Sequence, residues 1–243
     1  MILALDLDGT LLRTDKTISP RTDRALDEVQ RRGHRIIVAT ARPPRTTEQL
    51  LDGRVSEAPR VYYTGAIVTI DNKRVHYQTI DCPVAQSILT LLDELTPNST
   101  PIFYEIDDHL FTNRRVPPHQ GIPVDQTVVD LGPPLTGSPV KIVVDLRQLS
   151  DTSFLAELPS SVRHVVADGA IAMIMPHDVS KAAGVSVVLD RWLATFDHVI
   201  AIGDDLSDLD LIEQANLGVA MENGHPDVKA MADRIAPTND DDG

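Results

Sequence analysis

The segment ILALDLDGTLL, residues 2–12, places two aspartates inside an otherwise apolar run. Residues 2–7 predict a buried strand, because a parallel strand that is covered on both faces consists almost entirely of apolar residues. Carboxylates in such surroundings cost free energy unless a partner or a cation compensates their charge. Asp6 and Asp8 therefore lie either on the wet face of an edge strand or in a site that holds a cation, and the rest of the chain has to decide between the two.

Predicted strands and helices alternate through the first eighty residues. Strands that are almost wholly apolar and are separated by helices are typical of a parallel sheet covered on both faces. A hairpin with its turn at Asp71-Asn72-Lys73 is expected to follow. The predicted order is strand 2–7, a helix from the cap Ser19-Pro20 to Gly33, strand 34–40, helix 46–51 and strand 60–64.

The same alternation returns near the C-terminus, whereas the middle of the chain differs. Residues 80–177 combine one helix, 83–95, with strand-like pieces separated by prolines and glycines, which predicts an α+β insert with an antiparallel sheet. We therefore expect one α/β domain formed by residues 1–79 and 178–243, interrupted by that insert. The elements expected after the insert are helix 181–195, strand 198–203, helix 208–215, strand 217–221 and helix 226–232.

The composition excludes several classes of partner. The formal net charge of −14 argues against nucleic acid and against anionic membrane surfaces, since both select basic proteins. Cys82 is the single cysteine, so an intrachain disulfide and a cysteine-based zinc cluster are ruled out. No apolar run approaches the ~18 residues of a membrane span, and the N-terminus lacks the basic region of a signal peptide. We expect a cytoplasmic protein, and the composition leaves its oligomeric state open.

Several polar residues follow strands whose carboxyl ends meet at one edge of the predicted sheet. Ligands of open α/β sheets bind at this edge. Carboxylates that cluster there suit Mg²⁺, which prefers carboxylates, water and phosphate oxygens as ligands, and a lysine and a threonine beside it suit a phosphoryl group. The residues expected to converge are Asp6, Asp8, Thr40, Lys181, Asp204, Asp205 and Asp208.

Four segments resemble, in their order and approximate spacing, the four motifs of the haloacid dehalogenase-like hydrolases. They are DLDGT (6–10), VATAR (38–42), SKAAGV (180–185) and GDDLSDLDLI (203–212). YYTGAIV (62–68) and residues 217–243 are similar to segments of the Cof-type, subclass IIB phosphatases of that family. The resemblance implies a Rossmann-like core, an α+β cap that sets specificity, and an Mg²⁺-dependent phosphatase that acts on a small phosphorylated metabolite resembling a sugar phosphate.

The resemblance also implies a role for each matching residue. Asp6 would be the nucleophile that forms an aspartyl-phosphate, and Asp8 would give a proton to the leaving oxygen and later take one from water. Thr10 would help to orient Asp8. The implied metal site consists of Asp6, the backbone carbonyl of Asp8, Asp204 and, in support, Asp208. The residues implied to bind the phosphoryl group are Thr40, Lys181 and Thr10.

The chain departs from the family pattern at a few positions. Ala41 replaces the glycine that is common in the second motif, and Thr64 stands where the family often has Asn near the phosphate. In the fourth motif, Ser207 and Asp205 stand where Asn is common. Ser207 still donates a hydrogen bond, so we expect the metal site to be kept. Asp205 is either part of the site or an ordinary acid at a helix N-terminus, where the helix dipole favours it.

Most of the other candidates also have a plainer interpretation. Thr40 would suit a strand for its β-branched side chain alone, and Arg42 would suit a surface ion pair as well as a substrate contact. A solvated lysine at the start of a helix is disfavoured by the helix dipole, which favours a functional role for Lys181. The insert carries a basic cluster that would be either a solvated loop or a contact for an anionic or polyhydroxyl substrate. It consists of His109, Arg114, Arg115 and His119, and His177 is a further candidate at the rim.

Three functions remain after this comparison of residues and motifs. The first is a phosphomonoester hydrolase. The second is a phosphomutase or phosphotransferase, because an aspartyl-phosphate can also be passed to a sugar hydroxyl. The third is a non-catalytic ligand-binding relative, which would be expected to have lost motif residues that this chain keeps. No segment within residues 80–177 specifies one particular substrate.

Overall fold

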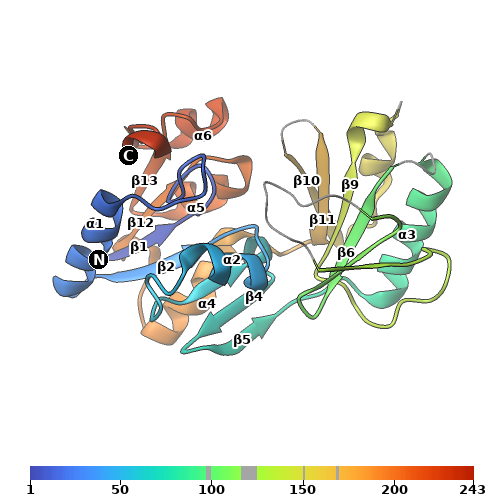
Figure 1. Cartoon of the computed structure of the whole chain (residues 1–243), viewed down its shortest axis with the longest axis horizontal. Coiled ribbons are helices and arrows are strands. Elements are labelled where there is room, and N and C mark those ends of the chain that lie inside the picture. The colour runs from blue at the N-terminus through green and yellow to red at the C-terminus, as the bar shows by residue number, and fades with distance from the viewer. Residues whose placement is uncertain (97–99, 116–124, 150, 168–169) are drawn as a thin grey trace. The chain divides into compact units, whose positions relative to one another are not determined.

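A computed structural model describes residues 1–96, 100–115, 125–149, 151–167 and 170–243 (Figure 1). These residues form two compact units. We call residues 1–77 with 179–243 the core unit, and residues 78–178 the insert unit. The α/β architecture with an inserted α+β unit confirms the fold class expected from the sequence.

The sheet of the core unit has, within the described residues, the strand order β14-β13-β12-β1-β2-β3-β4-β5. The pairs from β14 to β3 are parallel, and β4 and β5 add an antiparallel hairpin at one edge. Because β1 pairs with β12 on one side and β2 on the other, Asp6 follows an interior strand, and the edge-strand alternative is wrong. The strands are β1 (Ile2–Leu5), β2 (Arg35–Ala39), β3 (Arg60–Tyr62), β4 (Ile67–Ile70), β5 (Lys73–Tyr77), β12 (Val199–Gly203), β13 (Leu217–Met221) and β14 (Arg234–Ala236).

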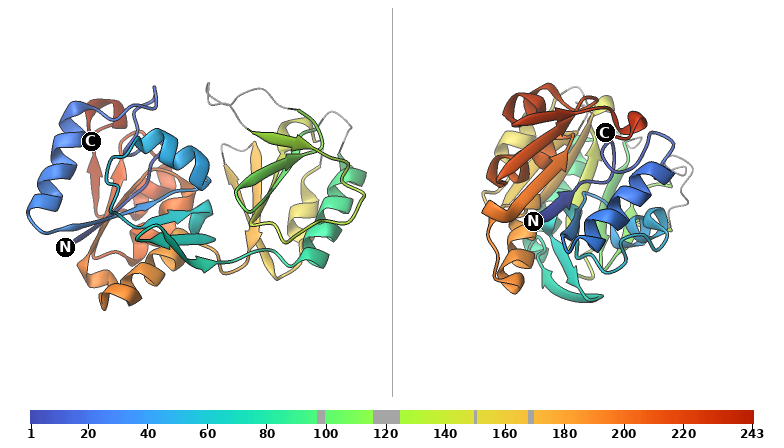
Figure 2. Two further views of the ribbon diagram at one scale, coloured as in Figure 1. Left: turned by 60° about the horizontal axis from the view of Figure 1, so that its bottom comes forward. Right: turned by 90° about the vertical axis from the view of Figure 1, so that its left-hand side faces the viewer.

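Helices cover both faces of this sheet, as the two views in Figure 2 show. On one face, α1 (Pro20–Arg31) and α2 (Pro44–Leu51) pack against alternate residues of β1 and β2. On the other face, α4 (Lys181–Trp192), α5 (Leu209–Gln214) and α6 (Pro226–Met231) pack against the intervening residues. Two covered faces explain why the strands are apolar throughout. None of the helices in the described part of the chain is long and apolar enough to span a membrane.

Local backbone chemistry sets where these elements begin and end. Ser19 caps α1, because its Oγ accepts a hydrogen bond from the Thr22 amide at 3.1 Å and Pro20 occupies the first helical position. The expected helix 181–195 ends earlier, at Trp192, because Leu193 adopts the left-handed conformation with φ +51°. The expected strand 60–64 ends at Tyr62, because Tyr63 and Thr64 are also left-handed.

In the described residues of the insert unit, an α-helix packs on a sheet. Helix α3 (Cys82–Leu95) packs its apolar face against one side of a sheet with the order β10-β11-β9-β6-β7-β8, as far as the described residues show. The pairs of this sheet are antiparallel, as expected, except that β7 and β8 run parallel. The strands are β6 (Ile102–Ile106), β7 (His109–Thr112), β8 (Gln126–Val128), β9 (Lys141–Asp145), β10 (Val162–Ala167) and β11 (Ile171–Pro176).

Candidate active site

A buried lysine joins two aspartates at the carboxyl edge of the core sheet. Asp6 comes directly after β1, and Lys181 is the first residue of α4, whose N-cap is Ser180. The Lys181 Nζ donates to the Asp6 Oδ1 at 2.5 Å and to the Asp208 Oδ1 at 2.6 Å. All three side chains are buried. Burial opposes the positive charge, but Asp208 and Asp6 outweigh it and hold the pKa of Lys181 above its ordinary value.

The loop after β12 is shaped by Asp208 and brings Asp204 to the same place. The Asp208 Oδ2 accepts hydrogen bonds from the amides of Asp204 at 3.1 Å and Asp205 at 3.0 Å. Asp205 in turn caps the short 3₁₀ turn at 206–208, which supports its interpretation as a helix-start acid. Gly9 lets the Asp204 side chain lie close to the backbone after β1. Its φ is +75°, and a Cβ at this position would lie 2.1 Å from the Asp204 Oδ2.

Thr10 contacts a different aspartate from the one expected. Its Oγ1 donates to the Asp204 Oδ1 at 2.9 Å, so the expectation that Thr10 orients Asp8 is wrong. The reason is the sharp turn at Gly9, after which the chain points toward the loop that follows β12. Thr10 therefore joins the first and the fourth motif, at residues that are 194 positions apart.

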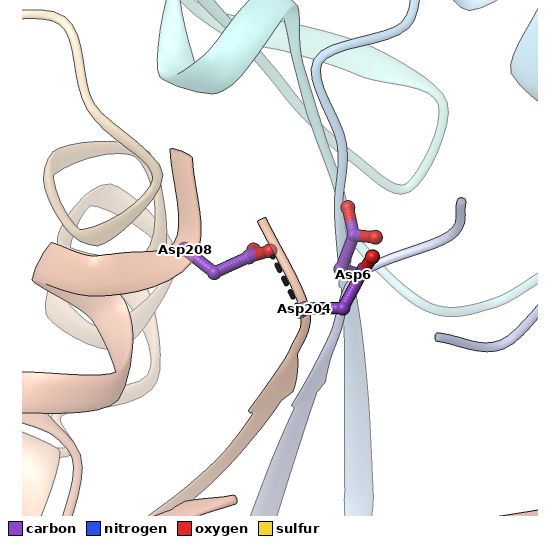
Figure 3. A group of neighbouring side chains, drawn as sticks. All are labelled: Asp6, Asp204 and Asp208. Carbon is purple, nitrogen blue, oxygen red and sulfur yellow. Dashed lines mark hydrogen bonds between the residues drawn. The ribbon is translucent and has the colours of Figure 1, made fainter. Parts of the chain in front are cut away.

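Asp6, Asp204 and Asp208 form a group that fits a divalent cation (Figure 3). One carboxylate oxygen from each lies within 4.8 Å of the others. Burial, together with repulsion from Asp208, raises the pKa of Asp204 to about 7, and burial with the same crowding raises the pKa of Asp6. Because both oxygens of Asp208 already accept hydrogen bonds, the direct ligands would come from Asp6 and Asp204, with Asp208 in support.

Asp8 is turned toward two cations instead of toward this group. Arg42 donates from Nε to the Asp8 Oδ2 at 2.5 Å and from Nη2 to the Oδ1 at 2.7 Å. Lys16 Nζ donates to the Oδ1 at 2.8 Å. Burial raises the pKa of Asp8, but the hydrogen bonds and charges of Arg42 and Lys16 outweigh it, so that the pKa lies below the ordinary value. Arg42 thus forms an ion pair inside the site, and Lys16 is a site residue that sequence reasoning missed.

Thr40 and Thr64 lie together where β2 and β3 end. The Thr64 amide donates to the Thr40 carbonyl at 2.9 Å, and both side chains are buried. Thr64 has φ +59°, which is strained for a β-branched residue, and within the described residues its buried hydroxyl has no hydrogen-bond partner. A strained residue with an unpaired buried hydroxyl is unusual outside functional sites, so Thr64 joins Thr40 as a candidate for ligand contact.

The basic candidate residues of the insert lie in different local surroundings. His109 hydrogen-bonds the Thr127 Oγ1 at 2.7 Å and stacks edge-on against Phe111. Arg114 and Arg115 are exposed residues that follow β7. His119 lies outside the described residues. His177 is exposed and hydrogen-bonds Asp178 at 2.8 Å.

Comparisons with known proteins show the family to which the chain belongs. The family model of the haloacid dehalogenase-like hydrolases matches residues 3–243. The 5-amino-6-(5-phospho-D-ribitylamino)uracil phosphatase YitU of Bacillus subtilis is 27% identical over 254 residues, which cover 100% of this chain and 94% of that protein.

Two solved structures share the fold. The structure of SMU.1108c from Streptococcus mutans UA159 superposes with a TM-score of 0.88 at 22% identity, and covers 100% of this chain and 95% of its own. The subclass IIB sugar phosphatase BT4131 superposes with a TM-score of 0.83 at 18% identity, with the same coverage of 100% and 95%. Since the family model matches almost every residue, the chain belongs to the haloacid dehalogenase-like hydrolases.

Proposed function

We propose that this protein is an Mg²⁺-dependent phosphatase that hydrolyses the phosphate monoester of a small metabolite through an aspartyl-phosphate on Asp6. The observation that carries the proposal is the setting of Asp6: a buried carboxylate at the end of the central strand β1, bonded to Lys181 at 2.5 Å and grouped with Asp204 and Asp208. A carboxylate in this position has the Lys181 ammonium as a partner and could share a metal ion with its two neighbouring carboxylates. Curated relatives named as phosphatases support the same reaction class.

The first step transfers the phosphoryl group to the protein. Asp6 attacks phosphorus, the bond to the ester oxygen breaks, and that oxygen leaves with a proton supplied by Asp8. In the second step, Asp8 takes a proton from water, which attacks phosphorus, releases inorganic phosphate and restores Asp6. The second step leaves Asp8 protonated, the form that the first step of the next cycle requires. The ion pairs with Arg42 and Lys16 favour the carboxylate form, which takes the proton from water in the second step.

Other core residues would stabilise the charge of the transferred group. The Lys181 ammonium and the hydroxyls of Thr40 and Thr64 are the proposed donors to phosphoryl oxygens. Mg²⁺, held by Asp6, Asp204 and the Asp8 carbonyl, would neutralise phosphoryl charge. Thr10 and Asp208 would keep Asp204 in place, through the hydrogen bonds to its carboxylate and its amide.

We propose a phosphorylated sugar or polyol as the substrate class. The relative YitU is named for a phosphoribityl compound, and BT4131 is named a sugar phosphatase. Substrate contacts are proposed for Arg42 and for three insert residues, His109, Arg114 and Arg115. A screen against phosphorylated metabolites tests this: release of inorganic phosphate from sugar or polyol phosphates supports it, whereas stoichiometric conversion into an isomeric sugar phosphate would favour the phosphomutase alternative.

Magnesium binding is expected to strengthen as the pH rises toward 7. The raised pKa of about 7 means that the folded, metal-free protein keeps a proton on Asp204 that the unfolded chain loses near pH 4. Stability of the metal-free protein therefore falls between pH 4 and pH 7, because the folded state binds more protons there. Mg²⁺ competes with this proton, so its affinity should rise by up to about tenfold per pH unit below 7 and level off above it.

Titration calorimetry with Mg²⁺ between pH 5 and pH 8 measures this dependence directly. Asp204→Asn is expected to lose both the binding and its pH dependence, while Asp178→Asn, an exposed change in the insert unit, is expected to bind as the wild type does. Activity should disappear in EDTA and return with added Mg²⁺. An affinity that does not change over this pH range would contradict the placement of the ion at Asp204.

A further inference from the structure

The loop that begins at Asp8 folds back so that its far end contacts Asp8 again. The Arg13 amide donates to the Thr17 carbonyl at 2.9 Å, and the Lys16 amide donates to the Arg13 carbonyl at 2.8 Å. Lys16 has φ +67°, so this tight turn is conformationally costly for it. The turn brings the Lys16 Nζ to 2.8 Å from the Asp8 Oδ1, which a more open loop would not do.

Residues Asn239–Asp242, near the C-terminus of the sequence, form hydrogen bonds with this loop. The segment contacts three consecutive loop residues, which lie between Asp8 and Lys16 in the sequence. The contacts are Asn239 Nδ2 to the Leu12 carbonyl at 2.9 Å, Arg13 to the Asp242 Oδ1 at 2.5 and 3.2 Å, and the Thr14 amide and hydroxyl to the Asp240 carboxylate at 2.8 and 2.7 Å.

Asn223 extends this contact to the beginning of the loop. Its Nδ2 donates to the Gly9 carbonyl at 2.8 Å, and its Oδ1 accepts from the Asn239 amide at 2.9 Å. The loop is therefore tied to the C-terminal part of the core unit both at Gly9, directly after Asp8, and at Thr14, two residues before Lys16. An acidic run such as 240–242 would repel itself without such partners. Instead, hydrogen bonds from Thr14 lower the pKa of Asp240, and hydrogen bonds from Ser19 and Arg13 lower that of Asp242.

We propose that Asn239–Asp242 is a positioning element for Asp8. The segment fixes the loop of residues 8–17 in the one conformation that presents Lys16 to the Asp8 carboxylate. Arg42 contacts the same carboxylate from the end of β2, so that Asp8 is held from two elements at once. The inference rests on the proposed role of Asp8 in proton transfer, and it assigns a catalytic consequence to contacts more than 220 residues apart in the sequence.

Steady-state hydrolysis of p-nitrophenyl phosphate by the full chain tests the proposal through the second step, in which Asp8 takes a proton from water. The variant Asp240→Ala/Asp242→Asn removes the hydrogen bonds to Thr14 and the charge that faces Arg13, and Lys16→Met removes the contact with Asp8. Each is expected to lower kcat about tenfold, a part of the ~10²–10⁴-fold that a positioned acid–base group contributes, with KM within about twofold of the wild type. Lys16→Arg is expected to restore most of kcat. Asp227→Asn, which removes an exposed charge on α6, is the matched control.

Combining the variants distinguishes positioning from general loosening of the fold. If the segment acts through Lys16, Asp240→Ala/Asp242→Asn should lower kcat no further in a Lys16→Met background. Thr14→Val removes only one hydrogen bond to Asp240 and should show a smaller loss in the same constant, which keeps the test available if the double variant does not fold.

Two results would overturn the proposal. The first is a wild-type kcat in the segment variants, Asp240→Ala/Asp242→Asn and Thr14→Val. The second is a combined variant whose kcat falls by the product of the separate losses from Asp240→Ala/Asp242→Asn and Lys16→Met. Asp6→Asn separates this from the proposed function. If Asp6→Asn is inactive while the segment variants are unaffected, only the positioning role is rejected. If Asp6→Asn keeps its activity, the proposed function itself is rejected.

Discussion

Replacing Asp6 with Asn is expected to lower turnover of an aryl phosphate by about 10⁴-fold or more, because the carboxylate nucleophile is replaced by an amide, which does not attack phosphorus. An aryl phosphate is the suitable substrate, since its leaving group departs without a proton and the measurement therefore isolates the attack by Asp6. The side chain keeps nearly the same shape, and Lys181 keeps its hydrogen bond to Asp208, so the protein should remain folded.

Controls make this result specific to the nucleophile. Thermal unfolding should shift by only a few degrees in Asp6→Asn, because the change also removes repulsion within the group of three carboxylates. Asp227→Asn, an exposed change on α6, should keep wild-type turnover. Activity of Asp6→Asn above about a tenth of the wild-type value would contradict the assignment.

Replacing Lys181 with Met is expected to affect stability and activity together. Lys181 is 1% exposed and is the shared partner of Asp6 and Asp208, so its removal leaves two buried carboxylates without compensation. Breaking a buried ion pair from one side costs about 3–5 kcal/mol. The loss of a charge that faces the phosphoryl group should lower kcat by a further 10²–10³-fold, roughly the value of one such donor. Denaturant unfolding and p-nitrophenyl phosphate turnover measure the two effects.

A second substitution separates the two effects of Lys181→Met. Adding Asp208→Asn removes one of the uncompensated charges, so the double variant should regain a large part of the lost free energy of unfolding. It should not regain activity, because the ammonium beside Asp6 is still absent. If stability and activity recover in parallel, Lys181 has a structural role alone. If Lys181→Met unfolds at the wild-type denaturant concentration, the burial argument is wrong.

The sequence predicted the parts of the site that follow strands. Asp6, Thr40 and Asp204 each come directly after a buried apolar strand, and the carboxyl ends of parallel strands meet at one edge. Lys181 was found because a lysine at a helix start is unfavourable unless it has a specific partner. The structure shows that partner to be a pair of carboxylates, at 2.5 and 2.6 Å.

The interactions that the sequence did not reveal are made between side chains of loops. Lys16 lies in a polar turn that reads like any solvated connection, and only the fold of residues 13–17 brings it to Asp8. The family resemblance led us to expect that Thr10 orients Asp8, whereas its hydroxyl contacts Asp204. Such contacts depend on backbone turns of one or two residues, and spacing in the sequence does not determine those.

Short polar strands were missed for a related reason. β8 and β14 have three residues each, and most of their side chains are at least partly exposed. Neither has the run of apolar residues that marks a buried strand, and each is formed because a longer neighbour, β7 or β13, offers a free edge. The pairing comes from tertiary structure and not from a local preference.

Trapping the covalent intermediate tests the central claim most directly. The wild-type protein is mixed with p-nitrophenyl phosphate and Mg²⁺, quenched in acid during turnover, digested and examined by mass spectrometry. We expect one phosphoryl group on the N-terminal peptide, assigned to Asp6 by fragmentation, and none in Asp6→Asn. A phosphoryl group on another residue, or hydrolysis by the wild type with no phosphorylated peptide at any quench time, would contradict nucleophilic catalysis by Asp6.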